Sequence, residues 1–123
     1  MSGDRRMLRV NELVREHLVE ILRREVSDPE LTKLVITSVD VSKDLSIAHV
    51  LVRHLAATDD EKARKGVLVR LRKVSPRLRR ALSTRIDMKK LPELRFDYDR
   101  GADAALRVAE LLQEIERDPH GED

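Results

Sequence analysis

The chain has 123 residues and carries 25 Lys and Arg against 23 Asp and Glu, for a formal net charge of +2. This length fits one domain with its own core, and the lack of cysteine excludes disulfides and thiolate metal sites. The opening residues hold no apolar run long enough for a secretory signal or a membrane span, so we expect a cytoplasmic protein with no membrane partner.

The first third of the chain predicts a helix and then two strands. Apolar residues recur at helical spacing from Leu8 to Val26, which predicts an amphipathic helix that begins after Asp4, reaches Ser27 and ends before Pro29. A turn then leads to two runs of alternating residues, which predict an antiparallel hairpin. Residues expected on one face of each strand are Val35, Thr37, Val39 and Val41 in the first, and Ala48, Val50 and Val52 in the second.

Basic residues are concentrated between positions 62 and 90, where twelve Lys or Arg side chains accompany one acid, Asp87, for a local charge of +11. The rest of the chain therefore sums to −9. Apolar residues in this segment recur at steps of three or four, the spacing of one buried helical face. They are Val67, Leu71, Val74, Leu78 and Leu82. One side of the segment is predicted to be core and the other to carry charge.

A proline interrupts this basic segment. Thr58 and Glu61 have capping-box spacing, which predicts a helix beginning near Asp59. Pro76 has no backbone N–H and restricts Ser75, so the segment is predicted to form two helices that meet at an angle. The predicted interhelical kink comprises Val74, Ser75 and Pro76.

The last third of the chain predicts a strand and a helix. After Pro92, the run ELRFDYD alternates, with Leu94, Phe96 and Tyr98 expected to face the helices. An amphipathic helix follows, with Ala105, Val108, Ala109, Leu112 and Ile115 on its apolar face. From Glu93 onward ten acids oppose four arginines, a net charge of −6, which should turn this end away from a phosphate backbone.

Together these elements predict an α+β fold with a three-stranded sheet covered by helices. The order is helix, strand, strand, helix, kink, helix, strand, helix, forming one domain over residues 1–117 with a short flexible tail at 118–123.

The basic segment predicts an RNA-binding surface. A solvated helix usually alternates charge to gain i,i+4 pairs, whereas twelve like charges here have almost no acidic neighbours in the segment. Phe96 and Tyr98 are the only aromatic residues and are predicted to be core, so we expect contacts to phosphates and not base stacking. The predicted RNA-binding residues are Arg70, Arg72, Lys73, Arg77, Arg79, Arg80, Arg85, Lys89 and Lys90.

From about Arg9 to Ile115 the sequence resembles the ribosome-binding factor A family. The residues that carry the resemblance are Arg9, Val10, Glu12 and Leu13, then Asp28 and Pro29, then VDVSKDLSIAHV from Val39 to Val50, then Leu78 and Arg79, and finally PELRFDYD from Pro92 to Asp99. The VSKDLS and PELRF elements, in this order and spacing, are the strongest part of the signal.

The resemblance implies a type II KH-like fold and a non-enzymatic assembly factor. It implies binding to the immature small ribosomal subunit and its precursor rRNA during late maturation, often in cold growth, with ribosomal proteins as further partners. The family's binding residues carry over to Arg77, Arg79, Arg80 and Arg85. This sequence departs from the family at Val74 and Pro76, where members have a small residue and a glycine, and at Asp87, which interrupts a commonly basic segment.

Two other functions remain open from the residues alone. A kinked helix pair at Pro76 could act as a DNA-binding helix-turn-helix, although the second helix offers no Asn or Gln for adenine edges before Arg85. Asp97 and Asp99, on one strand face, are the acid pair that a metal-dependent nuclease would need, although a solvent-facing strand edge explains them more simply. The four histidines lie on different predicted elements, so we expect no metal site, no cofactor and no catalytic residue. We expect a monomer.

Overall fold

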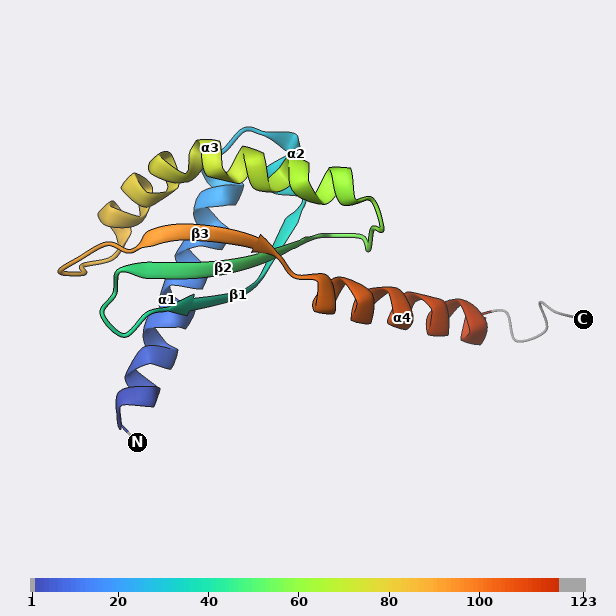
Figure 1. Cartoon of the computed structure of the whole chain (residues 1–123), viewed down its shortest axis with the longest axis horizontal. Helices are drawn as coiled ribbons and strands as arrows, with labels where there is room; N and C mark the ends of the chain where they lie inside the picture. Colours follow the sequence, from blue (N-terminus) through green and yellow to red (C-terminus); the bar gives the residue numbers. More distant parts are fainter. Residues whose placement is uncertain (1, 118–123) are drawn as a thin grey trace, which may run out of the picture.

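The computed structural model describes residues 2–117, with side chains from residue 5 onward. Four helices and three strands follow one another along these residues (Figure 1). In chain order they are α1 (Ser2–Arg24), α2 (Pro29–Thr32), β1 (Leu34–Val41), β2 (Ile47–His54), α3 (Glu61–Arg85), β3 (Glu93–Tyr98) and α4 (Arg100–Arg117). The predicted α+β class with a three-stranded sheet is confirmed. The tail predicted for residues 118–123 lies outside the described residues.

The strands form one sheet in the order β1-β2-β3. β1 and β2 are antiparallel and joined by a short turn, as the alternating runs predict. β2 and β3 are parallel, with Ala48 opposite Leu94 and Val50 opposite Phe96. Parallel neighbours need a crossover connection, and α3 supplies it. The crossover places the basic segment over the sheet.

One irregularity in β1 changes which residues face the core. The register slips by one residue at Thr37, which forms a β-bulge. Because side chains alternate along a strand, the extra residue reverses the faces on one side of the bulge. Ile36 is therefore buried together with Val39 and Val41, whereas Val35 and Thr37 are only partly buried. The prediction of one uninterrupted alternation was wrong for this half of β1.

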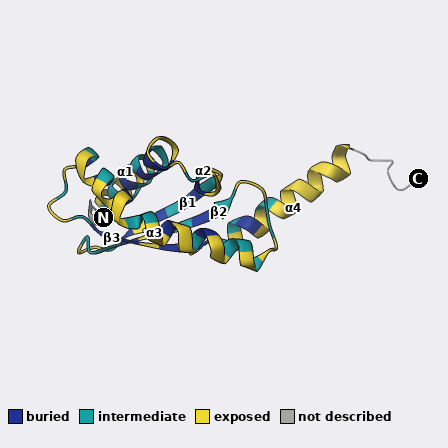
Figure 2. Ribbon diagram, turned by 90° about the horizontal axis from the view of Figure 1, so that it is seen from above, coloured by how far each residue is buried: buried dark blue, intermediate teal, exposed yellow. Residues whose placement is uncertain are grey.

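The core lies between the sheet and two helices, α1 and α3, which contact each other as well as the strands (Figure 2). β2 and β3 alternate as predicted, and their inward side chains are buried. On the opposite face of the sheet His49, Arg95 and Asp97 are exposed. The side chains that α1 and α3 bury most completely are Val14, Leu18, Ile21, Leu71, Leu78 and Leu82.

α3 is one continuous helix from Glu61 to Arg85, with Pro76 inside it. The predicted break into two helices was therefore wrong. Pro76 lies on the exposed side of α3, where the carbonyl that lacks its helical partner can bind water. Leu71 and Leu78, on either side of the proline, are both fully buried against the sheet, and this packing holds the helix together. α3 arches over the sheet with its outer side convex (Figure 1), a curvature that accommodates a solvent-facing proline.

Helix ends differ from the prediction at three places. α1 runs from Ser2 to Arg24, so it begins before Asp4 and ends before Ser27. Asp28 is the N-cap of the short helix α2, which the sequence indicated only as a turn. α3 begins two residues after the predicted start because Asp60 and not Thr58 is its N-cap, and the Asp60 carboxylate accepts hydrogen bonds from the N–H groups of the helix's second and third residues.

α4 leaves the sheet at the end of β3 and projects away from it (Figure 1). The helix forms where its periodicity predicts, but its apolar residues do not join the core. Val108 is 56% exposed, Leu112 57% and Ile115 65%. The expectation that every helix covers the sheet thus holds for α1 and α3 and fails for α4.

A polar cluster anchors the first turn of α4 to the rest of the fold. Asp103 is only 2% exposed, and its carboxylate accepts hydrogen bonds from the Arg64 guanidinium at 2.8 Å and the Thr58 backbone N–H at 3.3 Å. Arg64 in turn lies over the ring of Tyr98, 5.1 Å from its centroid. The Tyr98 hydroxyl accepts a hydrogen bond from the His54 backbone N–H at 3.0 Å, so β2, β3, α3 and α4 meet at this cluster.

Candidate nucleic-acid interface

The apolar residues of α3 pack into the core on its inner side, so its basic residues lie on the outer side. Val67, Leu71, Leu78 and Leu82 are buried as predicted, and Val74 packs against them from a partly buried position. Most exposed side chains of this 25-residue helix are Lys and Arg, and Val69, at 49% exposed, is the exception among its large apolar residues. The helix therefore displays its positive charge on the side opposite the sheet.

Six of the nine predicted RNA-binding residues lie exposed and form neither an ion pair nor a side-chain hydrogen bond within the described part of the chain. We call these six residues the basic surface. They are Arg72, Lys73, Arg77 and Arg80 on α3, and Lys89 and Lys90 in the loop that follows it. Because none of them forms an ion pair with a carboxylate of the described residues, their charge is available to an external anion.

The other three predicted residues are tied to neighbouring elements. Arg70 forms an ion pair with Asp28 at 2.8 Å, which lowers the pKa of that carboxyl. The Arg79 guanidinium donates to the backbone carbonyl of Leu91 at 2.9 Å. These contacts hold the ends of α2 and of the 86–92 loop against α3, so Arg70 and Arg79 support the surface while remaining exposed.

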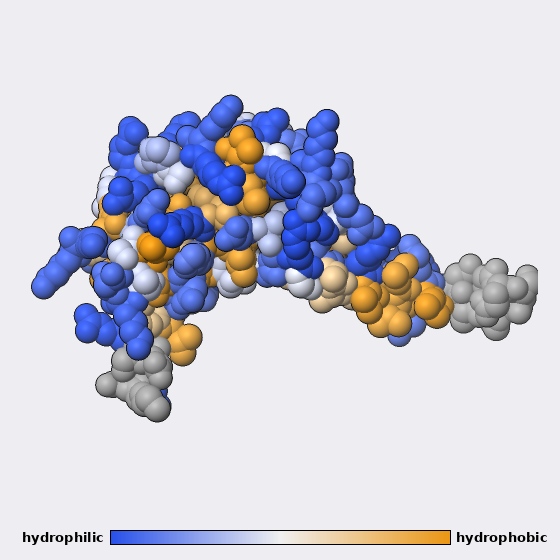
Figure 3. All heavy atoms as spheres, viewed as in Figure 1, coloured by the Kyte–Doolittle hydropathy of each residue, from blue (hydrophilic) through white to orange (hydrophobic). Residues whose placement is uncertain are grey.

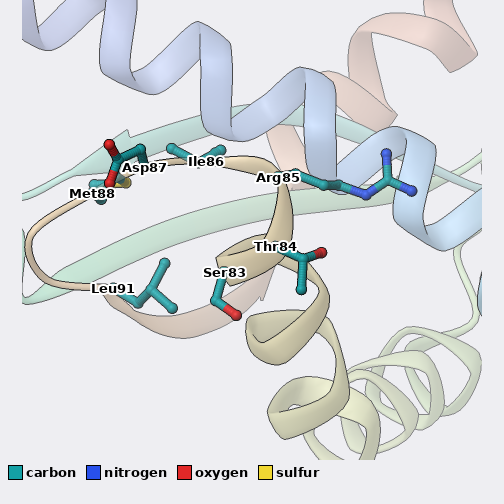
Figure 4. Close-up of a pocket in the computed structure, with 7 residues that line it drawn as sticks. All are labelled: Ser83, Thr84, Arg85, Ile86, Asp87, Met88 and Leu91. Carbon is teal, nitrogen blue, oxygen red and sulfur yellow. The ribbon is translucent and has the colours of Figure 1, made fainter.

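Arg85 is the least accessible of the nine predicted residues. Its guanidinium lies 3.5 Å from the Glu20 carboxylate and 3.0 Å from that of Glu25, and its side chain is 24% exposed. Figure 4 shows this side chain directed toward α1 and away from the loop. Its charge is thus largely matched by one acid of α1 and by Glu25, which directly follows that helix. The sequence alone could not indicate this pairing because the partners are 60 or more residues away.

The basic surface ends at a polar hollow beside the C-terminal turn of α3 (Figure 4). The hollow has a volume of about 330 Å³ and is open to solvent. The hydroxyls of Ser83 and Thr84 donate to carbonyls of their own helix, at 2.6 and 2.8 Å, which leaves their oxygen atoms free to accept. The residues that line the hollow are Ser83, Thr84, Arg85, Ile86, Asp87, Met88 and Leu91.

The β1–β2 turn brings one further basic residue to this end of the molecule. Lys43 is exposed in a turn that lies at the same end as the 86–92 loop (Figure 1). The charge of Lys90 helps to lower the pKa of Asp44, the neighbour of Lys43, after the hydrogen bonds from Ser46 and Ser42. The sequence predicted only a hairpin here, and Lys43 was not included among the predicted binding residues, although the basic side chain in the connection was the available signal.

Arg64 does not belong to the basic surface although it lies in the same basic segment. Its side chain is 14% exposed and is paired with the buried Asp103. This hydrogen bond raises the pKa of Arg64. Arg64 is therefore a structural residue that joins α3 to α4.

The geometry does not support the two other functions considered from the sequence. A helix-turn-helix at Pro76 needs two helices, whereas α3 is one. The Asp99 carboxylate accepts hydrogen bonds from Thr37 at 2.7 Å and from the Ala102 N–H at 2.9 Å, which lower its pKa and fix it as the cap of α4, while Asp97 lies on the exposed face of the sheet. Among residues 2–117 no group of three or more His, Asp or Glu side chains could hold a metal ion, and no helix is long and apolar enough to cross a membrane.

Comparison with known proteins assigns the chain to a family. The sequence model of a family described as "Ribosome-binding factor A" matches residues 6–112. A curated protein of that name from Sorangium cellulosum (strain So ce56) is 40% identical over 123 residues, covering 99% of this chain and 98% of the relative. Another, from Clostridium perfringens, is 36% identical over 108 residues, covering 87% of this chain and 91% of the relative.

Solved structures agree with the sequence comparison. The crystal structure of ribosome-binding factor A from Thermus thermophilus superposes with a TM-score of 0.63 at 30% identity, over 73% of this chain and 92% of that one. A homology model of the Thermus thermophilus factor, fitted into a cryo-EM map of a 30S complex with this factor, gives a TM-score of 0.57 at 32% identity, over 72% and 89% of the two chains. The fold, the sequence match over most of the chain and the shared structural core lead to one conclusion: the chain belongs to the ribosome-binding factor A family.

Proposed function

We propose that the protein is a non-enzymatic, cytoplasmic assembly factor that binds the immature small ribosomal subunit and aids its late maturation and rRNA processing. The observation that carries the proposal is the basic surface, six exposed cations without a neutralising acid among the described residues, on a chain of this family. A relative of this chain has been fitted into a map of a 30S complex, which supports the small subunit as the target.

The basic surface is proposed to contact phosphates of precursor rRNA. Guanidinium and ammonium groups on a convex helix and the loop that follows it can contact a phosphate backbone without reading bases. Tyr98 and Phe96 are buried, so neither provides a platform on which a base could stack. Selectivity then depends on the shape of the folded RNA and on additional contacts, and cold adaptation and the KH-like class remain expectations of the family resemblance.

A pair of matched charge reversals tests this proposal. Arg77→Glu/Arg80→Glu alters two exposed residues of the basic surface, whereas Arg5→Glu/Arg6→Glu alters two exposed arginines of α1 that form no ion pair among the described residues. Both double variants change the net charge equally. We expect the α3 variant to lower affinity for isolated small subunits at least about tenfold and the control by less than about threefold, because only the first removes phosphate contacts.

Co-sedimentation with small subunits, large subunits and duplex DNA, each at low and physiological salt, is the measurement. Selective retention on small subunits at physiological salt, lost in the α3 variant alone, supports the proposal. Equal losses in both variants would mean that only net charge matters, and undiminished binding of the α3 variant would rule out this surface.

A further inference from the structure

α4 carries an apolar stripe that the fold leaves uncovered. The stripe consists of Val108, Leu111, Leu112 and Ile115, which are between 51% and 65% exposed. Figure 3 shows hydrophobic side chains gathered on the arm that extends from the body, whose visible face mixes smaller hydrophobic patches with many hydrophilic side chains. Four large apolar residues on one face of a helix are the pattern of a helix that packs against a partner.

The stripe faces away from the body of the protein. Successive residues of an α-helix lie about 100° apart, so the centre of the stripe lies roughly 130° around the axis from Asp103. Asp103 is buried against Arg64, Arg107 forms an ion pair with Asp59 at 2.8 Å, and Glu110 lines a hollow beside Leu55. These three residues mark the side of α4 that faces the body, so the body cannot cover the stripe in this orientation.

Rotating α4 to bury the stripe against its own domain would break the anchor of the helix. Such a rotation removes the Asp103 carboxylate from Arg64 and from the Thr58 N–H, and leaves a buried guanidinium without its partner. The anchor therefore holds the stripe outward, where only another molecule can cover it.

The charges on α4 indicate the chemistry of that molecule. Two exposed acids flank the stripe, Glu114 one turn after Leu111 and Glu116 one turn after Leu112, and neither forms an ion pair among the described residues. The arginines Arg100 and Arg107 are instead paired with Glu61 and Asp59. An apolar stripe with acidic neighbours is unsuited to RNA, and a helix that lies on anionic lipid carries Lys and Arg on its polar face. Apolar contacts with an acidic rim fit an apolar groove with a basic rim on a protein.

A second copy of this chain fits less well. Two copies of α4 would bring like-charged Glu residues together at the edges of the stripe. Four side chains of one helix also supply well under the ~800 Å² that each partner contributes to a standard stable interface. A groove that encloses the helix would in addition bury Ala104, Ala105 and Ala109, which lie at the borders of the stripe.

We propose that α4 docks through its apolar stripe into an apolar, basic-rimmed groove on a protein of the small ribosomal subunit. This inference rests on the proposed function, because it makes α4 a second contact on the same particle. The basic surface then binds rRNA while α4, which leaves the sheet at its other end, binds protein.

The test compares intact small subunits with protein-free rRNA extracted from them. The stripe variant is Leu112→Ser/Ile115→Ser, and its matched control is Gln113→Ser/Arg117→Ser, two exposed residues of the same helix that lie off the stripe. We expect the stripe variant to lose at least about tenfold in affinity for intact subunits and to keep its affinity for free rRNA within about twofold, with the control unchanged. Circular dichroism checks that each variant is folded.

A crosslink identifies the class of partner directly. The chain has no cysteine, so Leu112→Cys and Gln113→Cys each place one photocrosslinker on or off the stripe. On small subunits we expect Leu112→Cys to label a protein and Gln113→Cys to label none. Labelling of rRNA alone, or a stripe-dependent dimer in analytical ultracentrifugation, would overturn the proposal.

The outcomes separate the docking helix from the proposed function. If the wild-type protein failed to bind small subunits, both the docking of α4 and the proposed function would be ruled out. Binding that depends on Arg77 and Arg80 but is unchanged in the stripe variant would overturn the docking helix and leave the rRNA contact standing. Equal losses of the stripe variant on subunits and on free rRNA would likewise overturn protein docking.

Discussion

Hydrogen bonds to one carboxylate hold the turn between β1 and β2. Asp44 accepts from the hydroxyls of Ser46 and Ser42, both at 2.7 Å, and from the Ser46 N–H at 3.1 Å. These bonds stabilise the charged carboxylate and lower the pKa of Asp44 from 3.8 to about 2. They also hold Leu45 in the left-handed region, at φ 61°, while its side chain packs against the core. The conformation of the turn is thus fixed by hydrogen bonds of Ser42, Asp44 and Ser46 and by the packing of Leu45.

Replacing one hydroxyl should be visible in the titration of this carboxyl. We expect Ser46→Ala to raise the pKa of Asp44 from about 2 toward 3.8, because the Ser46 hydroxyl is the largest cause of its lowering. The folded pKa lies below the unfolded one, so the turn's stabilisation is complete above about pH 3.8 and is lost as the pH falls toward 2. An NMR titration of side-chain carboxyl signals measures the change. Asp28, held by Arg70, should keep its lowered pKa in the variant, and an unchanged Asp44 would contradict the assignment.

At the scale of elements, α3 shows packing prevailing over a local helix breaker. A proline in a helix interior costs about 3 kcal/mol relative to alanine, since it removes one hydrogen bond and crowds the preceding turn. Burying Leu71, Leu78 and Leu82 offsets that cost, because each such side chain contributes roughly 1.5–3 kcal/mol when removed from water. The helix therefore stays continuous, and Pro76 remains on its outer side.

Replacement of the proline should stabilise the protein. We expect Pro76→Ala to raise the free energy of unfolding by up to about 3 kcal/mol, because alanine restores an N–H for the carbonyl of Arg72. Urea unfolding followed by circular dichroism measures the difference. The neighbouring Ser75→Ala is the control and should change stability by about 0.5 kcal/mol or less. A destabilising Pro76→Ala would show that the proline ring is required for the path of α3 over the sheet.

The sequence predicted the buried faces of the helices and strands well, but it did not predict irregularities that depend on tertiary packing. Apolar spacing identified the buried face of α3, the inward residues of β2 and β3, and the exposed basic side, because burial follows period in regular elements. The bulge at Thr37 was missed because one extra residue leaves the composition of β1 unchanged. The continuity of α3 was missed because a local rule for Pro76 was applied without the energy of tertiary packing.

The candidate binding surface likewise has features that the sequence predicts and features that depend on tertiary contacts. Exposure of Arg72, Lys73, Arg77 and Arg80 follows from their positions on the helix, and the sequence sufficed to predict it. The pairing of Arg70, Arg79 and Arg85 depends on residues 12 to 65 positions away, which no local pattern reveals. The exposure of the apolar face of α4 also depends on tertiary structure. Amphipathic spacing predicts that one face of the helix is apolar, but it does not show whether the same chain buries that face.

At the scale of the whole molecule, charge is distributed unevenly. The six cations of the basic surface occupy α3 and its following loop, while the unpaired acids of α4 lie on the arm that projects from the other end of the sheet (Figure 1). A phosphate backbone would attract the first region and repel the second, so the protein should approach RNA in one orientation.

This arrangement predicts a steep dependence of binding on salt. If all six side chains contact phosphates, the slope of log K against log salt for single-stranded RNA should be about −4, from a value of about −0.7 for each contact. We expect Arg77→Gln to reduce the magnitude of the slope by about 0.7, and Arg95→Gln, on the open sheet face, to leave it unchanged. Filter binding of rRNA fragments between about 50 and 300 mM salt gives both slopes. A slope near zero would exclude a phosphate-dominated contact.

The parallel pairing of β2 with β3 has a consequence for synthesis of the chain. α1 and the β1–β2 hairpin are made from neighbouring residues and can assemble as the nascent chain emerges. β3 is translated only after the whole of α3, so until Tyr98 has left the exit tunnel the central strand keeps one edge of unpaired N–H and C=O groups. Completion of the sheet and closure of the core by α3 are then late and concerted, and a chain terminated before β3 exposes an edge that is prone to pair with other strands.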